Sequence, residues 1–184
     1  MLDKIQMQML TEVADLHGVP EGAYNIRVNG EKAGRNTTAN IDIATKTDGK
    51  SGIDIRIKPG TKNESVHIPV VLSESGIKET VYNDFYIGED SDVVIVAGCG
   101  IHNCGNQDSQ HDGVHRFFVG KNARIRYVEK HYGEGDGAGK RILNPVFPKI
   151  SESCFISFYK PIFIKILCNC NYPWLRRCYL MLNL

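Results

Sequence analysis

The sequence contains no apolar run that approaches the ~20 residues needed to cross a bilayer, and it has little excess charge of either sign. Its 184 residues hold 22 Lys and Arg against 21 Asp and Glu, a net charge of +1. This balance excludes the basic surface of a general nucleic-acid binder. The opening residues, MLDKIQMQML, mix polar with apolar side chains and predict no secretory signal. We therefore expect a cytoplasmic chain of one domain, or one domain plus an appendage, that contacts neither membrane nor nucleic acid.

Glycine and acidic residues are nearly missing from the end of the chain. Residues 1–146 hold all 18 glycines and 20 of the 21 acids, whereas 147–184 hold four of the six cysteines and eight of the 16 aromatic residues. The tail shows no helical or strand period. We interpret it as an irregular segment that a frameshift or truncation produced. A membrane- or partner-docking appendage and a metal knuckle at Cys168 and Cys170, which lack the usual two-residue gap, are the alternatives.

Helical periodicity is confined to the N-terminus. Apolar residues recur every three or four positions over 2–16, and Gly18 follows, which predicts an N-terminal helix within residues 1–18. From residue 19 onward the period becomes two. Segments 23–28, 39–43 and 53–57 alternate apolar and polar residues, as strands with one buried face do.

A 32-residue repeat follows these strands. YIGEDSDVVIVA (86–97) matches FVGKNARIRYVE (118–129): an aromatic residue, an aliphatic residue and glycine, then a polar corner and a strand. Asp90 and Asn122 suit corners that need left-handed backbone angles. A strand–corner–strand unit at a fixed period predicts an all-β solenoid over 19–146. An antiparallel β-sandwich is the structural alternative.

Thiols and imidazoles concentrate in residues 98–115. Soft donors of this kind suit iron, iron–sulfur clusters, zinc or copper(I). Cys99 is the best single candidate, although it follows an apolar strand and is alternatively a small buried hydrophobe. The spacing fits no closed zinc site, and a nucleophilic Cys99 with His115 as its base remains a further alternative. The candidate metal ligands are Cys99, His102, Cys104, His111 and His115.

Other local features are weaker. The glycine-rich segment 133–139 lacks the ending of a phosphate loop and is acidic, so we expect a flexible turn. Glu129 and His131 are predicted to lie at a solvated strand end, with support of the cysteine–histidine segment as the alternative. His17 and His67 are interpreted as structural.

Several of these segments together resemble the SufB/SufD family, the scaffold proteins of SUF-type iron–sulfur cluster assembly, and most of all its short SufB-like members. The resembling segments are LHGVPEGAYNIR (16–27), DFYIGEDSDVVIVAGCG (84–100), RYVEKHYG (126–133) and RILNP (141–145). The resemblance implies a right-handed parallel β-helix. It implies a non-enzymatic scaffold that receives sulfur and iron, builds a transient iron–sulfur cluster and passes it to apo-proteins. It also implies as partners a SufC-type ABC ATPase and a second SufB/SufD-like subunit.

The resemblance also implies site residues. Cys99 matches the cysteine of the family's Gly-Cys motif, a sulfur-accepting or cluster-linked thiol, and His115 matches the histidine that follows. Cys104 lies between them, where family members vary; we include it with Cys99 and His115 as contacts of the cluster. This role needs an exposed Cys99 thiolate with a lowered pKa. The resemblance ends near residue 146, so the ATPase-docking region is expected to be missing. The other function class is a metal-free structural or interaction solenoid, or a non-functional truncated relative.

Overall fold

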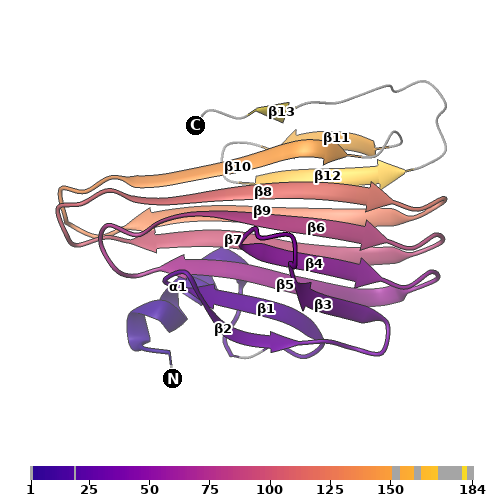
Figure 1. The fold of residues 1–184 in the computed structure, drawn as a ribbon, viewed down its shortest axis with the longest axis horizontal. Coiled ribbons are helices and arrows are strands. Elements are labelled where there is room, and N and C mark those ends of the chain that lie inside the picture. Colours follow the sequence, from indigo (N-terminus) through magenta and orange to yellow (C-terminus); the bar gives the residue numbers. More distant parts are fainter. Residues whose placement is uncertain (1, 19, 151–153, 160–162, 170–179, 182–184) are drawn as a thin grey trace.

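The computed structural model describes residues 2–18, 20–150, 154–159, 163–169 and 180–181, and this part of the chain is mostly β (Figure 1). Its strands form two mixed sheets. One has the order β11-β12-β9-β7-β5-β1-β2 and the other β13-β10-β8-β6-β4-β3. The elements are α1 (Lys4–Ala14), β1 (Ala23–Val28), β2 (Glu31–Asn36), β3 (Ile41–Thr45), β4 (Gly52–Ile57), β5 (Lys62–Leu72), β6 (Lys78–Ile87), β7 (Asp92–His102), β8 (Ser109–Val119), β9 (Arg124–Glu134), β10 (Arg141–Ile150), β11 (Cys154–Tyr159), β12 (Phe163–Asn169) and β13 (Leu180–Met181).

The predicted N-terminal helix is present as α1. Asp3 caps its start by accepting a hydrogen bond from the backbone N–H of Gln6, and the Gln6 side chain returns one to the Asp3 N–H, a capping box. The helix buries Met9 and Val13 against the outer face of the sheet that contains β5, β7 and β9. Glycine at position 98 makes room for it, because a Cβ there would overlap the Val13 backbone. No helix in the described ranges is long and apolar enough to cross a membrane.

Successive long strands alternate between the two sheets. β5, β7 and β9 pair in parallel in one sheet, and β4, β6, β8 and β10 pair in parallel in the other. The register of β7 with β9 and of β6 with β8 joins residues 32 positions apart, as in Val93↔Ile125 and Asn83↔His115. The 32-residue sequence repeat is therefore the register of neighbouring parallel strands. This pairing differs from the antiparallel sandwich considered as the alternative.

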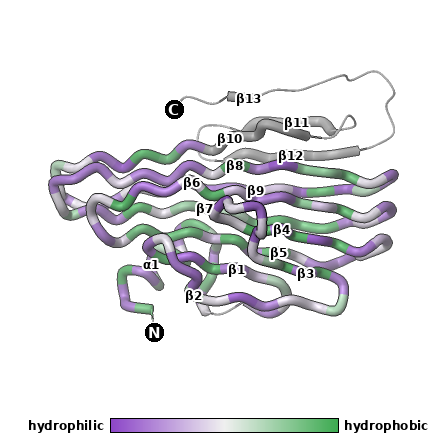
Figure 2. The backbone as a smooth tube through the Cα atoms, viewed as in Figure 1, coloured by the Kyte–Doolittle hydropathy of each residue, from purple (hydrophilic) through white to green (hydrophobic). Residues whose placement is uncertain are grey.

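Apolar side chains fill the space between the sheets, and hydropathy alternates along the strands (Figure 2). Phe85 and Phe117 stack with ring centroids 4.5 Å apart, and Tyr127 from the opposite sheet meets Phe117 edge-on at 5.3 Å. At the corners, Asp90 and Asn122 have φ of 55° and 56°, as predicted. The Asn122 amide donates to Asp90 at 3.1 Å. Equivalent residues of the repeat thus lie against each other both in the core and at the corners.

The glycine-rich segment 133–139 is packed rather than free. Cβ atoms at Gly135, Gly137 and Gly139 would overlap the backbone of the segment 103–107, 32 residues earlier. The Arg141 guanidinium donates to the carbonyl oxygens of Asn103 and Glu134, among others. The glycines are needed because two loops stack backbone on backbone, so the expected turn is present and is packed against the loop before it.

The C-terminal tail forms strands in part. β12 pairs antiparallel with β9, and β11 pairs antiparallel with β12. The expectation of an irregular tail is wrong for these strands, because β9 leaves an open edge and aromatic and β-branched residues favour extended pairing. Residues 151–153, 160–162, 170–179 and 182–184 lie outside the described residues, and so does Cys170 of the considered metal knuckle.

Replacing Gly137 by alanine tests the loop stacking. A methyl group against the Gly105 backbone forces the two loops apart, so we expect Gly137→Ala to lower the free energy of unfolding by about 2–3 kcal/mol. Gly18→Ala is the matched control: its Cβ meets open space, and its change should stay within about 0.5 kcal/mol. Urea denaturation followed by circular dichroism measures both. Equal stability of the two variants would contradict the stacking.

Candidate functional site

Strand alternation divides the five predicted metal-ligating residues between two places. On β7, Cys99 faces the interior, whereas His102 faces outward and pairs in register with Glu134 of β9. On β8, His111 and His115 both face the interior and are buried. Cys104 follows β7 and is exposed. The structure therefore brings Cys99 together with two histidines inside, and Cys104 together with His102 outside.

The interior group belongs to a larger set of ionisable side chains between the sheets, which we call the buried belt. Along β6 and β7 it lies between the apolar cluster around Phe85 and the smaller cluster of Leu72 and Ile101. Burial of charge is costly unless each group has a partner. The buried belt consists of Arg27, Glu79, Cys99, His111, His115, Glu129 and His131.

Glu79 binds one end of the buried belt together. One of its carboxylate oxygens lies 2.9 Å from the Arg27 guanidinium, and the other lies 2.9 Å from Nδ1 of His111. Arg27 also donates to the Gly30 carbonyl at 2.6 Å. Burial alone would raise the pKa of Glu79, but the hydrogen bonds from His111 and Arg27 outweigh it and hold this pKa below its ordinary value. Glu79 is therefore a largely buried carboxylate that stays ionised.

Glu129 contacts two histidines at the other end of the buried belt. Its Oε1 lies 3.6 Å from Nε2 of His115 and 3.4 Å from Nε2 of His131. Burial raises the pKa of Glu129, yet the hydrogen bond from His115, the charges of both histidines and the Tyr127 hydroxyl lower it overall. Burial lowers the pKa of His131, against the pull of Glu129. The prediction of a solvated strand end for Glu129 and His131 is wrong, because odd-numbered residues of β9 face the interior.

Cys99 lies within this belt and not at a surface. It is 1% exposed, sits in register with His131 and packs with Val70 and Ile101. Burial raises the pKa of its thiol well above the ordinary value, and the charges of Glu79 and Glu129 raise it further. The expected exposed thiolate with a lowered pKa is therefore wrong at this position. The structure agrees with the alternative of a small buried hydrophobe.

The outer group forms a connected chain of polar contacts, which we call the surface thiol site and define as His102, Cys104, Glu134 and Asp136. The Cys104 sulfur lies 3.1 Å from Nε2 of His102, and Nδ1 of His102 lies 3.1 Å from Oε1 of Glu134. The Tyr132 hydroxyl donates to Oε2 of Glu134 at 3.0 Å. The Cys104 thiol beside Asp136 holds the pKa of that carboxyl below its ordinary value. The Cys104 thiol, the His102 imidazole and the Glu134 carboxylate are thus connected by successive contacts.

Sequence reasoning missed Arg27, Glu79, Glu134 and Asp136. The repeat offers the signal that could have found three of them. Adding 32 to a position gives its neighbour in the next repeat, which joins Glu79 to His111 and His102 to Glu134 in the strands, and Cys104 to Asp136 in the stacked loops. Arg27 belongs to β1, which precedes the repeat, and no pattern in the sequence points to it.

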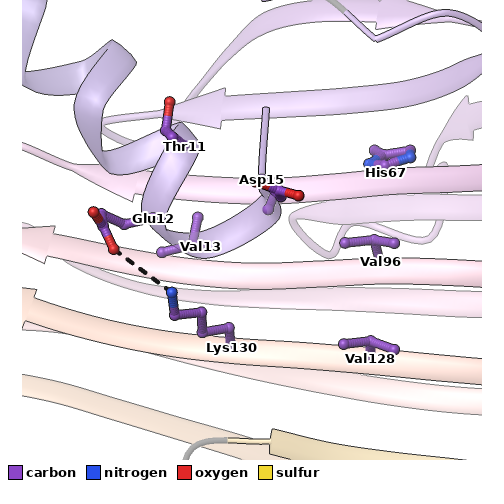
Figure 3. A pocket seen from close by; sticks show the side chains of 9 residues that line it. Thr11, Glu12, Val13, Asp15, His67, Val96, Val128 and Lys130 are labelled. Atoms are coloured by element: carbon purple, nitrogen blue, oxygen red, sulfur yellow. Dashed lines mark ion pairs between the residues drawn. The ribbon is translucent and has the colours of Figure 1, made fainter. Parts of the chain in front are cut away.

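Neither group is a preformed metal site. Among the described residues, no three His, Cys, Asp or Glu side chains are arranged to hold a metal ion. A cavity of about 420 Å³ lies between the end of α1 and the outer face of the sheet (Figure 3). Val96, Val128 and His67 line it, and Lys130 pairs with Glu12 across it at 3.6 Å. None of the predicted site residues lines this cavity.

No protein-family model, curated protein or solved structure matches the chain. Its function is therefore inferred from its residues and their geometry. The sequence resemblance contributes an expectation, and the two groups of donors contribute the chemistry.

Removing the charge of Glu129 tests whether the buried belt carries stability. Glu129→Gln leaves His115 and His131 without their carboxylate, so we expect a loss of about 3 kcal/mol in unfolding free energy at pH 7. Urea denaturation measures it. Glu31→Gln, at an exposed carboxylate, is the matched control and should change stability by less than about 0.5 kcal/mol. A loss no larger than that of the control would show that the belt is energetically neutral.

The buried belt also predicts how stability depends on pH. Glu79 and Glu129 have folded-state pKa values below those of the unfolded chain. Their contribution is complete above about pH 4.5 and is lost as the pH falls through the folded values. The lowered pKa of His131 acts in the same direction below about pH 6.5. The free energy of unfolding should therefore fall on acidification. Below about pH 4.5 it should fall less steeply in Glu129→Gln than in the native chain. Parallel profiles of the two proteins would contradict this assignment.

Proposed function

We propose that the chain is a component of an iron–sulfur cluster assembly scaffold of the SufB/SufD type, with a right-handed parallel β-helix as its fold. Two observations support this reading. The four resembling segments lie at intervals between residues 16 and 145. The long parallel strands alternate between two sheets at a 32-residue register, as the coils of such a helix would.

The observation that carries the proposal is the exposed Cys104 thiol beside the His102 imidazole. Soft sulfur together with imidazole suits iron and sulfide. Cys104 is the exposed one of the two cysteines whose side chains the structure describes, so it takes the role first expected of Cys99. The cluster is cargo that the scaffold receives and releases. A site that must release its cargo does not need a closed set of four ligands.

The buried belt has a structural part in this function. Glu79 joins β6 to β8 through His111, and Glu129 on β9 contacts His115 on β8 of the opposite sheet. The contact of Glu129 holds β9, whose last residue, Glu134, belongs to the surface thiol site. Cys99, His111 and His115 would reach cargo only if the sheets separated, and the proposed function does not require that.

The partners in this proposal are a SufC-type ABC ATPase, a second SufB/SufD-like subunit and apo iron–sulfur proteins. The chain contributes assembly and no catalysis of its own. The family resemblance ends near residue 146. An ATPase-docking surface of the family type would therefore have to come from another subunit.

A metal-free structural or interaction solenoid is the second candidate. It is favoured by the lack, within the described ranges, of any three donors placed to hold a metal ion. Its stacked loops and buried belt would then serve only to build a rigid surface. Iron binding separates the two candidates.

Anaerobic reconstitution of the full chain with ferrous iron and sulfide tests the proposed function. We expect the desalted protein to retain iron and a visible charge-transfer absorption. Cys104→Ser should weaken iron retention by at least about tenfold, because a soft donor is lost. Cys99→Ser is the matched control and should retain iron as the native chain does.

Two results would contradict the proposal. If Cys104→Ser retains as much iron as Cys99→Ser, the surface thiol site is not where the cargo binds. If the folded native chain retains no iron at all, the metal-free solenoid replaces the scaffold. Inductively coupled plasma mass spectrometry quantifies the iron, and circular dichroism confirms that each variant is folded.

A further inference from the structure

The surface thiol site has the order of groups that activates a thiol. Nδ1–H of His102 donates to the Glu134 carboxylate at 3.1 Å, which fixes the tautomer that leaves Nε2 as an acceptor. That nitrogen lies 3.1 Å from the Cys104 sulfur, within reach of its proton. The hydrogen bond from the Tyr132 hydroxyl holds the carboxylate in place. Nucleophile, base and orienting group are all present on one surface.

We propose that Cys104 is a nucleophilic thiol, activated by His102, that exchanges with positively charged disulfides. The Cys104 sulfur attacks one sulfur of the disulfide R–S–S–R while Nε2 of His102 takes the thiol proton. The S–S bond breaks, a new bond joins the Cys104 sulfur to one R–S group, and the other leaves as a thiolate that receives the proton as R–SH. The disulfide is the only co-reactant, and the reverse step with R–SH restores the thiol.

The surroundings favour attack on sulfur over acyl transfer. Acyl transfer needs free N–H donors that stabilise an oxyanion. Three neighbouring backbone donors, those of Gly105, Gly137 and Gly139, are engaged: the N–H of Gly105 donates to the Asn103 side chain at 3.0 Å, and that of Gly137 to the Asn103 carbonyl at 3.2 Å. The N–H of Gly139 donates to the Gly105 carbonyl at 3.0 Å. Exchange at a disulfide develops its negative charge on sulfur and needs no such donors.

Local charge selects the disulfide. Asp136 lies between Gly135 and Gly137, which stack on the backbone of residues 103–105, and Glu134 lies behind His102. The nearby Arg141 guanidinium donates to the carbonyl oxygens of Asn103, Glu134 and other residues of the stacked loops, but it keeps its positive charge, which also acts on Asp136. Two carboxylates face one guanidinium here, so the summed charge of these groups is negative. It attracts a cationic disulfide and repels an anionic one.

Cys99 provides an internal comparison, because it is buried and its pKa is raised. A thiol in that state is inert toward disulfides. The exchange stands on the geometry of the surface thiol site and does not depend on the proposed scaffold function. If both hold, a mixed disulfide on Cys104 blocks cargo binding until it is reduced.

The test uses the metal-free full chain without sulfide under anaerobic conditions. Cystamine is the cationic disulfide, oxidised glutathione is the anionic one, and peptide mass spectrometry follows mixed-disulfide formation at each cysteine separately. We expect Cys104 to react with cystamine at least about tenfold faster in the native chain than in His102→Gln. Glu134→Gln should also slow it. His17→Gln, at an exposed histidine away from the site, is the matched control and should leave the rate unchanged.

Charge selection gives a second readout. The measured quantity is the rate of reaction with cystamine divided by the rate with oxidised glutathione. At low salt we expect this ratio to be larger for the native chain than for a peptide of residues 100–108. Added salt should reduce the difference between the two ratios. Equal rates in His102→Gln and the native chain would overturn the activation by His102. A native preference no greater than that of the peptide would overturn the charge selection. Neither result bears on iron retention in the reconstitution experiment.

Discussion

The parallel register of 32 residues is the constraint on which the rest of the structure depends. It places Val93 against Ile125 in one sheet and Asn83 against His115 in the other, so each position meets its own equivalent one repeat later. Phe85 therefore stacks on Phe117, and Asp90 receives a hydrogen bond from Asn122. The same register sets loop 133–139 on loop 103–107 and makes glycine necessary there. A single spacing in the sequence thus determines core, corners and loops together.

Much of this could be predicted from the sequence, since the spacing, the alternation and the corner residues are local patterns. The N-terminal helix, the strands and the left-handed corners at Asp90 and Asn122 followed from them. The burial of Cys99 did not follow from these local patterns. Alternation says that Cys99 and His102 face opposite ways, but not which face is covered. Inward-facing Ala97 and Ile101 decide that Cys99 is inside, and the segment around Cys99 is too rich in glycine for hydropathy to show it.

The tail and the charged core escaped prediction for another reason. Strand 163–169 has no pattern of its own that fixes a partner; it pairs with β9 because that edge is open. Glu129 and His131 look like surface residues in isolation, and only contacts with His115 from the other sheet explain their burial. Interactions between distant segments decide such positions, and a single sequence shows them only through the repeat. The surface thiol site shows how the repeat can reveal such a contact, because it joins His102 to Glu134.

The buried belt resolves an ambiguity that the apolar core leaves open. Because strand side chains alternate with a period of two, a slip of two residues between β6 and β8 would keep every inward position inward. Such a slip would cost little in a uniformly apolar core. Here it would move His111 away from Glu79, and it would displace His115 from Glu129 if β8 alone moved. Each displacement takes one of two partners from a carboxylate of the belt, which costs more than the apolar mismatch. The ionised belt therefore selects one register of β6 with β8 among those that hydrophobic burial allows.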